Sequence, residues 1–352
     1  MSVSTRRDRV DGRIVDPLEP SISIIIPVHN GGASFRQCLQ SLSAVASDVL
    51  EIIVVEDGGT DDSGQLAEQF GATVCRFSSA GGPARARNRG AQLARGDVLF
   101  FIDADVTLTR ETIDQLKAAF RNRPSLSVLI GSYDDAPGAT NFLSQYKNLF
   151  HHYTHQTSCE QGSTFWGACG AIRRDVFWSV GGFDERYRYP SVEDIELGYR
   201  LRQAGYPIYL CKAVQVKHLK HWGVHSLLRA EIFYRAIPWT ELLWHYRQFS
   251  NDLNLKYSSR LSLIFTFALA LSLLAGLIWP PAWTLGAIAG GALFFLNLPV
   301  YRFFRQKRGV WFTLRVIPWH WLYFLYGGCS FIIGTIRYHW RSPVQMRLND
   351  LS

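Results

Sequence analysis

The stretch VLFFIDADVTL, residues 98–108, joins an uninterrupted apolar run to two aspartates one residue apart. Val98–Ile102 is short, wholly apolar and rich in β-branched and aromatic residues, which is typical of a buried parallel strand. Asp103 and Asp105 follow at its end, where an uncompensated carboxylate at the edge of a core is costly. The pattern therefore predicts a buried strand that brings two acids to a site where something compensates their charge.

Apolar runs of the same kind precede this strand and alternate with segments of helical spacing. Such alternation, at roughly 25-residue intervals, predicts an α/β fold with a parallel sheet and right-handed crossovers. Polar clusters follow three of the strands, at the edge where such sheets bind ligands, so one pocket is expected there. The expected strands are Ile22–Pro27, Ile52–Val55, Thr73–Arg76 and Val98–Ile102, and the expected helices are Ala33–Ala46, Asp61–Phe70 and Pro83–Ala94.

Charge is divided unevenly along the 352 residues. Residues 1–211 contain 21 Lys and Arg against 25 Asp and Glu, whereas residues 212–352 contain 16 against 4. An acidic first part and a basic, aromatic second part indicate two environments, and the basic part suits nucleic acid or an anionic membrane surface. DNA binding is not expected, because the basic residues flank apolar segments and do not form a groove. The six scattered cysteines show no metal-type spacing and are expected to be free thiols of a reducing compartment.

Two uncharged segments, residues 261–279 and 282–300, are each long enough to cross a bilayer. Basic residues flank the pair on both outer sides and the connecting turn carries no charge, so the positive-inside rule places both outer flanks in the cytoplasm. A buried helical hairpin is the alternative. A third apolar run, residues 316–336, contains no Asp, Glu, Lys or Arg and a single histidine, His320, and it either spans the membrane or lies partly in its interface.

Residues 226–249 mix Leu, Ile and Trp with Arg at helical spacing, and Pro238 interrupts them. This composition predicts helices that lie on a membrane surface, with packing against the first domain as the alternative. The first residues, MSVSTRRDRVDGRIVDP, are charged and lack an apolar core, so they predict a disordered leader and no signal peptide.

Four motifs, taken in order, carry a family resemblance: SIIIPVHN, IIVVEDGGTDDS, GGPARARNRGAQLARGDVLFFIDAD and FWSVGGFDERYRYPSVEDIELGYRL. Together they resemble the family 2 glycosyltransferases, which have the GT-A fold, over about residues 21–218. Two positions depart from the usual pattern. Glu56 stands where Asp is more frequent, and His29 stands where an aromatic residue is frequent.

The resemblance implies a role for each strand-end residue. Pro27 and the backbone around His29 line the nucleotide base, and Asp57 accepts a hydrogen bond from it. Asp103 contacts the ribose and the donor sugar. The residues implied to bind the nucleotide sugar are Pro27, His29, Asn30, Asp57, Arg87, Asn88, Asp103 and Ala104.

The resemblance also implies Mg²⁺ or Mn²⁺ as a cofactor, held by Asp105 with Asp103 and His218. Hard divalent cations prefer oxygen ligands and often bridge carboxylates to a diphosphate. For two of the residues named above, one assigned to the metal and one to the nucleotide sugar, a structural role is the alternative. His218 fits equally a histidine at the junction with the membrane part, and Arg87 fits a solvated position on its helix.

The acidic pair Glu193 and Asp194 is the implied catalytic pair, with Asp194 as the general base that deprotonates an acceptor hydroxyl. The alternative is structural, because Ser191 followed by Asp194 also resembles a helix start with a capping box. A phosphate acceptor is already nucleophilic and needs no base, so the pair favours a hydroxyl acceptor. The run STFWGACGA, residues 163–171, fits either a floor for the sugars or core packing.

The sequence thus predicts a membrane-anchored inverting glycosyltransferase that moves a sugar from a nucleotide-diphosphate sugar to a hydroxyl of a lipid, lipid-linked or glycan acceptor. The alternatives are transfer to polyprenyl phosphate, a dinucleotide-dependent oxidoreductase and a non-catalytic scaffold. PVHNGG lacks the G-x-G-x-x-G turn that an oxidoreductase needs. A multi-pass protein of the cell membrane with a cytoplasmic catalytic domain, acting on a cell-envelope glycan, is expected.

The predicted organisation has five parts. The central one is a GT-A domain with a Rossmann-like, mostly parallel sheet. In order they are a disordered leader (1–20), the GT-A domain (21–222), amphipathic interface helices (223–258), transmembrane helices (259–340) and a tail (341–352).

Overall fold

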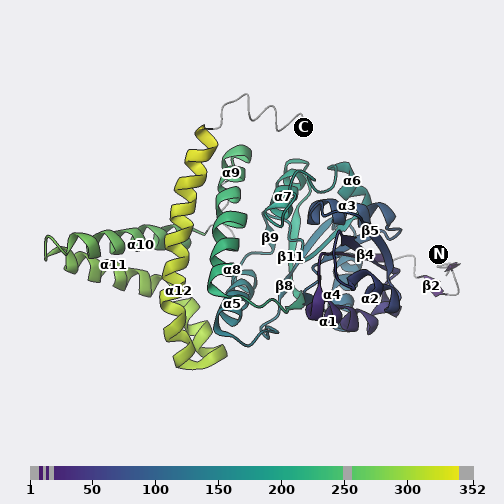
Figure 1. The fold of residues 1–352 in the computed structure, drawn as a ribbon, viewed down its shortest axis with the longest axis horizontal. Coiled ribbons are helices and arrows are strands. Elements are labelled where there is room, and N and C mark those ends of the chain that lie inside the picture. Colours follow the sequence, from purple (N-terminus) through teal and green to yellow (C-terminus); the bar gives the residue numbers. More distant parts are fainter. Residues whose placement is uncertain (1–7, 11–12, 16–19, 249–255, 341–352) are drawn as a thin grey trace, which may run out of the picture. The chain divides into compact units, whose positions relative to one another are not determined.

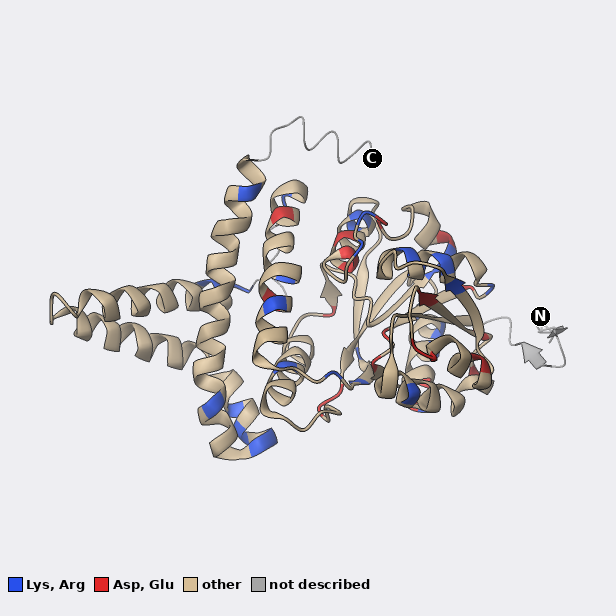
Figure 2. Ribbon diagram, in the orientation of Figure 1, with Lys and Arg blue, Asp and Glu red and all other residues tan. Residues whose placement is uncertain are grey.

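The computed structural model describes residues 8–10, 13–15, 20–248 and 256–340, and it divides the chain into two compact units (Figure 1). The first unit comprises residues 1–139 and 159–220, and the second comprises 140–158 and 221–352. Residues 140–158, which lie inside the predicted domain 21–222, thus group with the second unit. Almost all acidic residues belong to the first unit (Figure 2).

Four parallel strands form one half of the large sheet of the first unit, in the order β5-β4-β3-β6. Their bounds agree with the sequence-based strands to within two residues at each end. A helix follows β3, β4 and β5, and after β6 a two-residue strand precedes the next helix, so strands and helices alternate as predicted and the α/β class is confirmed. The strands are β3 (Ile22–Val28), β4 (Glu51–Asp57), β5 (Thr73–Phe77) and β6 (Val98–Ile102).

The other half of this sheet is mixed, which differs from the mostly parallel sheet that the sequence predicts. β10 lies between β6 and β8 and is antiparallel to both, whereas β11 is parallel to β8 and antiparallel to β7 and β9. The crossover pattern of the first half therefore does not continue. The strands are β7 (Val106–Thr107), β8 (Val128–Tyr133), β9 (Gln161–Gly162), β10 (Cys169–Arg173) and β11 (Ile208–His218).

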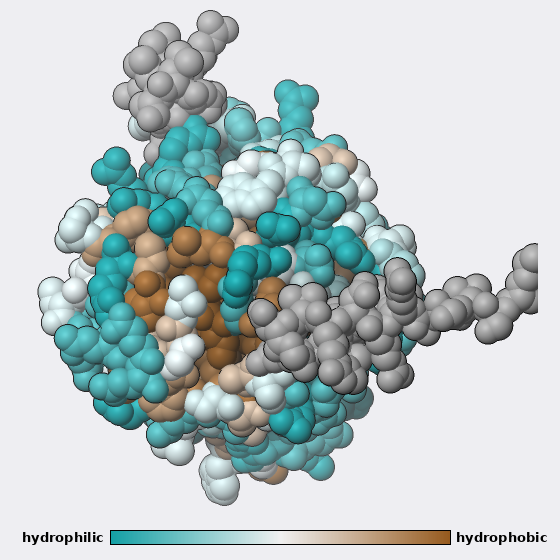
Figure 3. Space-filling model, turned by 90° about the vertical axis from the view of Figure 1, so that its right-hand side faces the viewer, coloured by the Kyte–Doolittle hydropathy of each residue, from teal (hydrophilic) through white to brown (hydrophobic). Residues whose placement is uncertain are grey.

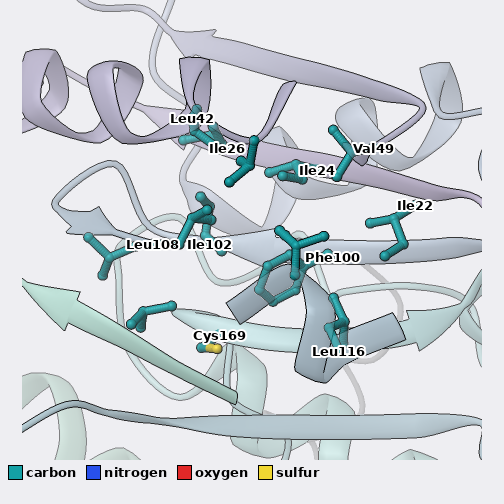
Figure 4. Close-up of a cluster of buried hydrophobic side chains, with 14 of the residues drawn as sticks. Ile22, Ile24, Ile26, Leu42, Val49, Phe100, Ile102, Leu108, Leu116 and Cys169 are labelled. Atoms are coloured by element: carbon teal, nitrogen blue, oxygen red, sulfur yellow. The ribbon is translucent and has the colours of Figure 1, made fainter. Parts of the chain in front are cut away.

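The two faces of the sheet bury two separate apolar clusters, because alternate side chains of a strand point to opposite sides. In β3, Ile24 and Ile26 enter the first cluster and Ile25 enters the second. Figure 4 shows the first cluster, with Ile24 and Phe100 among its labelled side chains. On the side of the first unit that Figure 3 faces, an apolar area is surrounded by hydrophilic residues.

Helices cover the strands of the first unit. Their bounds are α1 (Gly32–Ser43), the 3₁₀-helix η1 (Ala46–Asp48), α2 (Ser63–Gln69), α3 (Pro83–Leu93), α4 (Arg110–Asn122), α6 (Arg174–Ser179) and α7 (Glu193–Gln203). In the predicted leader, β1 (Asp8–Val10) and β2 (Arg13–Val15) pair as a short antiparallel ribbon. The rest of the leader and the predicted tail lie outside the described residues. All six cysteines are free.

The second unit is helical. Its elements are α5 (Phe142–Gln156), α8 (Val224–Arg229), the π-helix η2 (Ala230–Ala236), α9 (Ile237–Tyr246), α10 (Tyr257–Ala275), α11 (Ala282–Leu296) and α12 (Leu298–Trp340). Pro238 does not end the helical path as the sequence suggests. It occupies the first turn of α9, where a missing N–H is tolerated, directly after the π-helical turn.

Two of the described helices, α10 and α12, are long and apolar enough to cross a membrane. The expected second membrane span, residues 282–300, is not one continuous helix of that length in the structure. α11 ends at Leu296 after 15 residues, short of the roughly 17–25 residues that a bilayer requires. The third apolar run, residues 316–336, lies inside α12 and belongs to a helix of sufficient length.

Glycines let the helices of this unit approach closely. A Cβ atom at Gly328 of α12 would lie 2.3 Å from Phe267 of α10, and one at Gly334 would lie 2.7 Å from Thr240 of α9. The indole N–H of Trp244 also donates to Thr335 at 2.9 Å. Part of the predicted interface segment therefore packs on the apolar half of α12, through small residues of the kind that helix contacts in membranes use.

Candidate active site

The loop after β3 and the loop after β4 are tied together by side chains of His29 and Asn30. His29 Nδ1 lies 2.7 Å from the carbonyl oxygen of Asp57, which can only accept, so this nitrogen carries the hydrogen. Asn30 has a left-handed backbone (φ 52°), and its side-chain oxygen accepts from the backbone of Thr60 at 2.7 Å. Both side chains thus hold the loop after β3 against the loop after β4.

Asp57 holds the start of α3. Its carboxylate accepts from the backbone N–H groups of Gly81 and Gly82 at 2.8 and 2.7 Å, just before the helix begins at Pro83. Gly82 has φ 96°, and a Cβ atom there would lie 2.6 Å from the carbonyl group of Arg188. The chain around Arg188 therefore lies against the same loop that binds Asp57, a contact that the sequence analysis missed although GGP was visible before the helix.

Arg87, in α3, joins two acids from distant parts of the sequence. Its Nη2 lies 2.7 Å from Asp103 Oδ1, and its Nη1 lies 2.9 Å from Glu193 Oε1. The side chains of Arg87 and Glu193 are each 6% exposed, whereas that of Asp103 is 34% exposed. The alternative interpretation of Arg87, as a solvated residue on its helix, is therefore wrong. Of the three side chains, that of Asp103 is the one that a ligand can reach.

Asp194 stands beside this bridge at the start of α7. Its Oδ2 accepts from the backbone of Gly167 at 3.0 Å, and its Oδ1 accepts from that of Ile195 at 2.8 Å. A Cβ atom at Gly167 would lie 3.0 Å from the guanidinium carbon of Arg87, so the glycine permits this close approach. Val192, not Ser191, is the N-cap residue, and the capping box considered from the sequence does not form.

Asn88 makes its contacts within the protein. Its amide nitrogen donates to the Phe183 carbonyl at 2.8 Å and to Glu185 at 2.9 Å, and its oxygen accepts from the Phe183 backbone at 2.8 Å. Asn88 is buried. It thereby fixes the segment that leads to Arg188, and a contact with nucleotide remains a prediction.

Asp105 and His218 lie together at the ends of neighbouring strands, with 3.6 Å between His218 Nε2 and Asp105 Oδ2. The imidazole of His218 stacks on Tyr133 at 4.5 Å between ring centroids, and Tyr133 packs edge-on against Trp166. Burial raises the pKa of Asp105, but interaction with His218 and the charge of Lys220 together lower it to about 2. The carboxylate is therefore ionised at neutral pH.

These two residues fit a cation only in part. Within the described residues, no group of three or more His, Cys, Asp or Glu side chains is arranged to hold a metal ion. Asp103, the third predicted ligand, is held by Arg87. Mg²⁺ commonly uses one or two carboxylates and takes its other ligands from substrate phosphates and water. The donor set matches that mode and not a closed protein cage.

The remaining predicted residues lie on the strands that carry the site. Pro27 belongs to β3 and pairs with Val55 of β4. Ala104 lies between the two aspartates and packs partly against the first apolar cluster. The structure thus places all the predicted site residues in the first unit, around the ends of β3, β4, β6 and β11 and the starts of α3 and α7.

The family model described as Glycosyl transferase family 2 matches residues 23–181. These residues belong to glycosyltransferase family 2. A probable glycosyltransferase of Bacillus subtilis, YdaM, is 28% identical over 211 residues, which cover 54% of this chain and 48% of that protein. A pre-mycofactocin glycosyltransferase of Mycobacterium tuberculosis is 25% identical over 66% of this chain and 51% of its own length. The chain therefore spans about half the length of these relatives.

The solved structure of a mannosyltransferase from Pyrobaculum calidifontis, in complex with GDP-Man and Mn²⁺, resembles this chain in fold. The TM-score is 0.50 at 16% identity, and the match covers 89% of this chain and 87% of that one. Likeness at this identity concerns the fold alone. It agrees with the mixed sheet described above, and the predicted GT-A fold is confirmed.

Proposed function

We propose that this chain transfers a sugar from a nucleotide-diphosphate sugar to a hydroxyl group of a lipid, lipid-linked or glycan acceptor, with inversion at the anomeric carbon. The family of residues 23–181 supports a glycosyltransferase. The observation that supports the proposed reaction is the bridge that Arg87 forms between Asp103 and Glu193. It holds Asp103, on the proposed donor side, within one hydrogen-bonded group with Glu193, next to Asp194 on the proposed acceptor side.

Asp194 is the general base of the proposed reaction. Its Oδ2 accepts from the backbone N–H of Gly167 and its Oδ1 accepts from that of Ile195, which fixes the carboxylate at the start of α7 beside the Arg87 bridge. As the acceptor oxygen bonds to the anomeric carbon, Asp194 takes its proton, and the bond from that carbon to the diphosphate oxygen breaks. The nucleoside diphosphate leaves from the opposite face. A base of this kind typically contributes 10²–10⁴-fold in rate.

Glu193 acts as a positioning residue in this proposal. Its carboxylate is buried, pairs with Arg87 and accepts from the backbone of Ser191 at 2.8 Å. It thereby holds the first turn of α7 and, with it, the neighbouring Asp194. Arg87 is likewise a positioning residue, on the donor side, because it would orient the partly exposed carboxylate of Asp103 toward the ribose or sugar hydroxyls.

Asp105 and His218 would hold Mg²⁺ or Mn²⁺ together with the donor diphosphate. When bound, such a cation neutralises the charge that develops on the leaving phosphate. His29, Asn30 and Asp57 form the loops on which the base of the nucleotide would rest. Pro27, Asn88 and Ala104 complete the proposed donor site.

Membrane anchoring is part of the proposal. α10 and α12 are long and apolar enough to span, and basic residues lie beside their ends. We expect a multi-pass protein of the cell membrane with the catalytic unit on the cytoplasmic side. Such an anchor would keep the site near a lipid-borne acceptor.

The test is an assay of the purified full chain, in detergent, with a panel of nucleotide sugars and total membrane lipid as acceptor. Asp194→Asn is expected to abolish transfer while donor binding, measured by calorimetry, persists. The matched control is Asp175→Asn, because Asp175 is an exposed acid in the first turn of α6 in the same unit. Equal losses in both variants would contradict the assignment of the base.

The same variant separates the two acceptor classes. A polyprenyl phosphate acceptor is nucleophilic without a base, so Asp194→Asn would then leave turnover unchanged. Calorimetric titration with UDP, GDP and NAD tests the alternative that the protein is a dinucleotide-dependent oxidoreductase. Metal-dependent binding of a nucleoside diphosphate without binding of NAD is expected, and binding of NAD alone would refute the proposed transferase.

A further inference from the structure

The long helix α12 turns sharply at Gly309. The backbone there has φ 81° and ψ −180°, a combination that is essentially restricted to glycine. Residues 298–308 and 310–340 are thus two helical segments that meet at an angle. Residues 302–315, on both sides of the turn, are called the elbow below.

The elbow is strongly basic. It contains five cationic side chains, four of them exposed, and the sequence of α12 contains no Asp or Glu from end to end. Figure 2 shows the basic residues gathered where α12 turns. The five are Arg302, Arg305, Lys307, Arg308 and Arg315.

Large apolar side chains are exposed beside these cations. Trp311 is 82% exposed, Val310 is 56% exposed and Leu314 is 51% exposed. Trp311 and Leu314 are three positions apart and therefore lie on one face of the helix. Arg315 is exposed at the border of this face, and its guanidinium lies 4.1 Å from the ring centroid of Phe142 in α5. Exposed tryptophan next to arginine is unfavourable in water alone, whereas it is the composition found where a protein meets lipid headgroups.

The opposite face of the elbow is fixed by α5. The ring of Phe312 lies 5.0 Å from that of Phe142, and Phe304 lies 5.8 Å from Tyr146. Arg308 also donates to Gln145 at 2.9 Å. Because these contacts hold the turn on both sides, the exposed cations and Trp311 form one surface of defined shape and not a flexible tail.

We propose that the elbow binds the headgroups of anionic phospholipids, with Trp311 and Leu314 entering the interface and the arginines pairing with lipid phosphates. The surface continues directly into residues 316–336, the apolar half of a helix long enough to span a bilayer. A nucleic acid or an acidic protein would also satisfy the cations, but neither accounts for the apolar helix that continues directly from this surface. The inference rests on the membrane anchoring proposed above and adds a preference for lipid charge.

The experiment titrates the purified full chain, in an uncharged detergent, with dioctanoyl phosphatidylglycerol or dioctanoyl phosphatidylcholine and follows binding by thermophoresis. We expect the anionic lipid to bind roughly tenfold or more tightly than the zwitterionic one, since each basic residue near such a surface adds attraction. Binding is expected to weaken strongly at about 0.5 M NaCl, where screening is nearly complete beyond a few ångströms. Inorganic phosphate at the same concentrations is expected not to compete, which distinguishes a lipid from a free anion.

The triple variant Arg302→Gln/Arg305→Gln/Lys307→Gln is expected to lose the preference for the anionic lipid. The matched control removes three exposed arginines of the first unit, Arg36→Gln/Arg121→Gln/Arg174→Gln, and is expected to keep it. Trp311→Ala, which changes no charge, is expected to weaken binding of both lipids.

Equal binding of the two lipids by the unaltered chain, or equal loss in both triple variants, would overturn the elbow as a lipid site. Those outcomes leave membrane anchoring intact if the chain still inserts into phosphatidylcholine vesicles. A chain that stays monodisperse without detergent and binds neither lipid would instead refute the anchoring on which the inference rests.

Discussion

Arg87 donates a hydrogen bond to Glu193 across 106 residues of sequence, with 2.9 Å between Nη1 and Oε1. Both side chains are buried, and the same guanidinium binds Asp103 through its other terminal nitrogen. The pairing therefore links the loop after β6 with the start of α7. It also neutralises a carboxylate that would otherwise be costly to bury.

Replacing Arg87 by Met is expected to destabilise the protein by about 3–5 kcal/mol, because it leaves the buried carboxylate of Glu193 without its oppositely charged partner. Arg87→Lys keeps the charge but cannot make both bonds of the fork, so a smaller loss of about 1–3 kcal/mol is expected. Chemical unfolding followed by circular dichroism measures both changes. Arg89→Met, on the same helix with an exposed hydrogen bond to Gln92, is the control and should have little effect. A similar loss in the control would mean that the bridge is unimportant.

Replacing Gly82 by Ala is expected to destabilise the loop before α3 and to weaken nucleotide binding. The new Cβ would have to adopt a φ of 96° and would lie 2.6 Å from the Arg188 carbonyl, at the residue whose N–H donates to Asp57. Gly71→Ala is the matched control, since Gly71 has φ 80° but no atom within 4 Å of the added Cβ. The control measures the cost of a positive φ alone, about 1–2 kcal/mol, and the loss at Gly82 is expected to exceed it because of the Arg188 carbonyl and of ψ 164° at this position. Equal unfolding energies and equal calorimetric affinities in the two variants would contradict the role of this contact.

Removal of divalent metal is expected to abolish tight binding of a nucleoside diphosphate, and Mn²⁺ alone is expected to bind weakly. The reason is that Asp105 and His218 supply two ligands and the diphosphate must supply others. Asp105→Asn should weaken metal-dependent nucleotide binding more than about 100-fold, since even loss of an outer partner of a metal ligand costs 10–100-fold. Calorimetry with and without chelator measures this, with His225→Ala, an exposed histidine, as control. Tight binding of Mn²⁺ without nucleotide would disagree with the proposed site.

Asp184 gives a prediction for pH dependence. Burial raises the pKa of Asp184, but hydrogen bonds from Arg186 and the charges of Arg186 and Arg200 outweigh it, so the pKa lies below its usual value. A depressed pKa in the folded state contributes stability above the unfolded pKa, and that stability is lost as pH falls through the folded value. The difference in unfolding free energy between the unaltered chain and Asp184→Asn should therefore be constant near neutral pH and shrink below about pH 4. A difference that stays constant down to pH 3 would rule out this assignment.

The sequence predicted the parallel half of the sheet well because its signal is local. Val98–Ile102 is apolar throughout and ends at a charged residue, so its bounds follow from the pattern alone. The antiparallel placement of β10 has no such signal, because Cys169–Arg173 looks like any short apolar run. Its place in the sheet is set by pairing with β6 and β8, which are distant in the sequence, and the pattern of a single sequence does not encode such pairing.

The candidate site shows the same division. Asp103, Asp105 and Asp194 were predicted from motifs. The contact of Gly167 with Asp194 and that of Arg188 with Gly82 were not, because both are ordinary residues until the fold brings them close. The burial of Arg87 was missed for a related reason. In the sequence it stands between Arg85 and Arg89, and nothing local distinguishes the one that faces two acids. The shorter α11 was missed because the apolar composition continues past Leu296 although the helix does not.

The path of the chain limits how this protein can be divided for experiments. It leaves the first unit after residue 139, contributes α5 to the second, and returns at residue 159. Truncation at residue 220 would therefore not release the first unit alone, because α5 would remain attached, and its Tyr146 and Leu149 would lose the α12 residues that cover them and would become exposed to water. A soluble version would need those residues of α5 replaced by polar ones, or the excursion between residues 139 and 159 shortened to a loop.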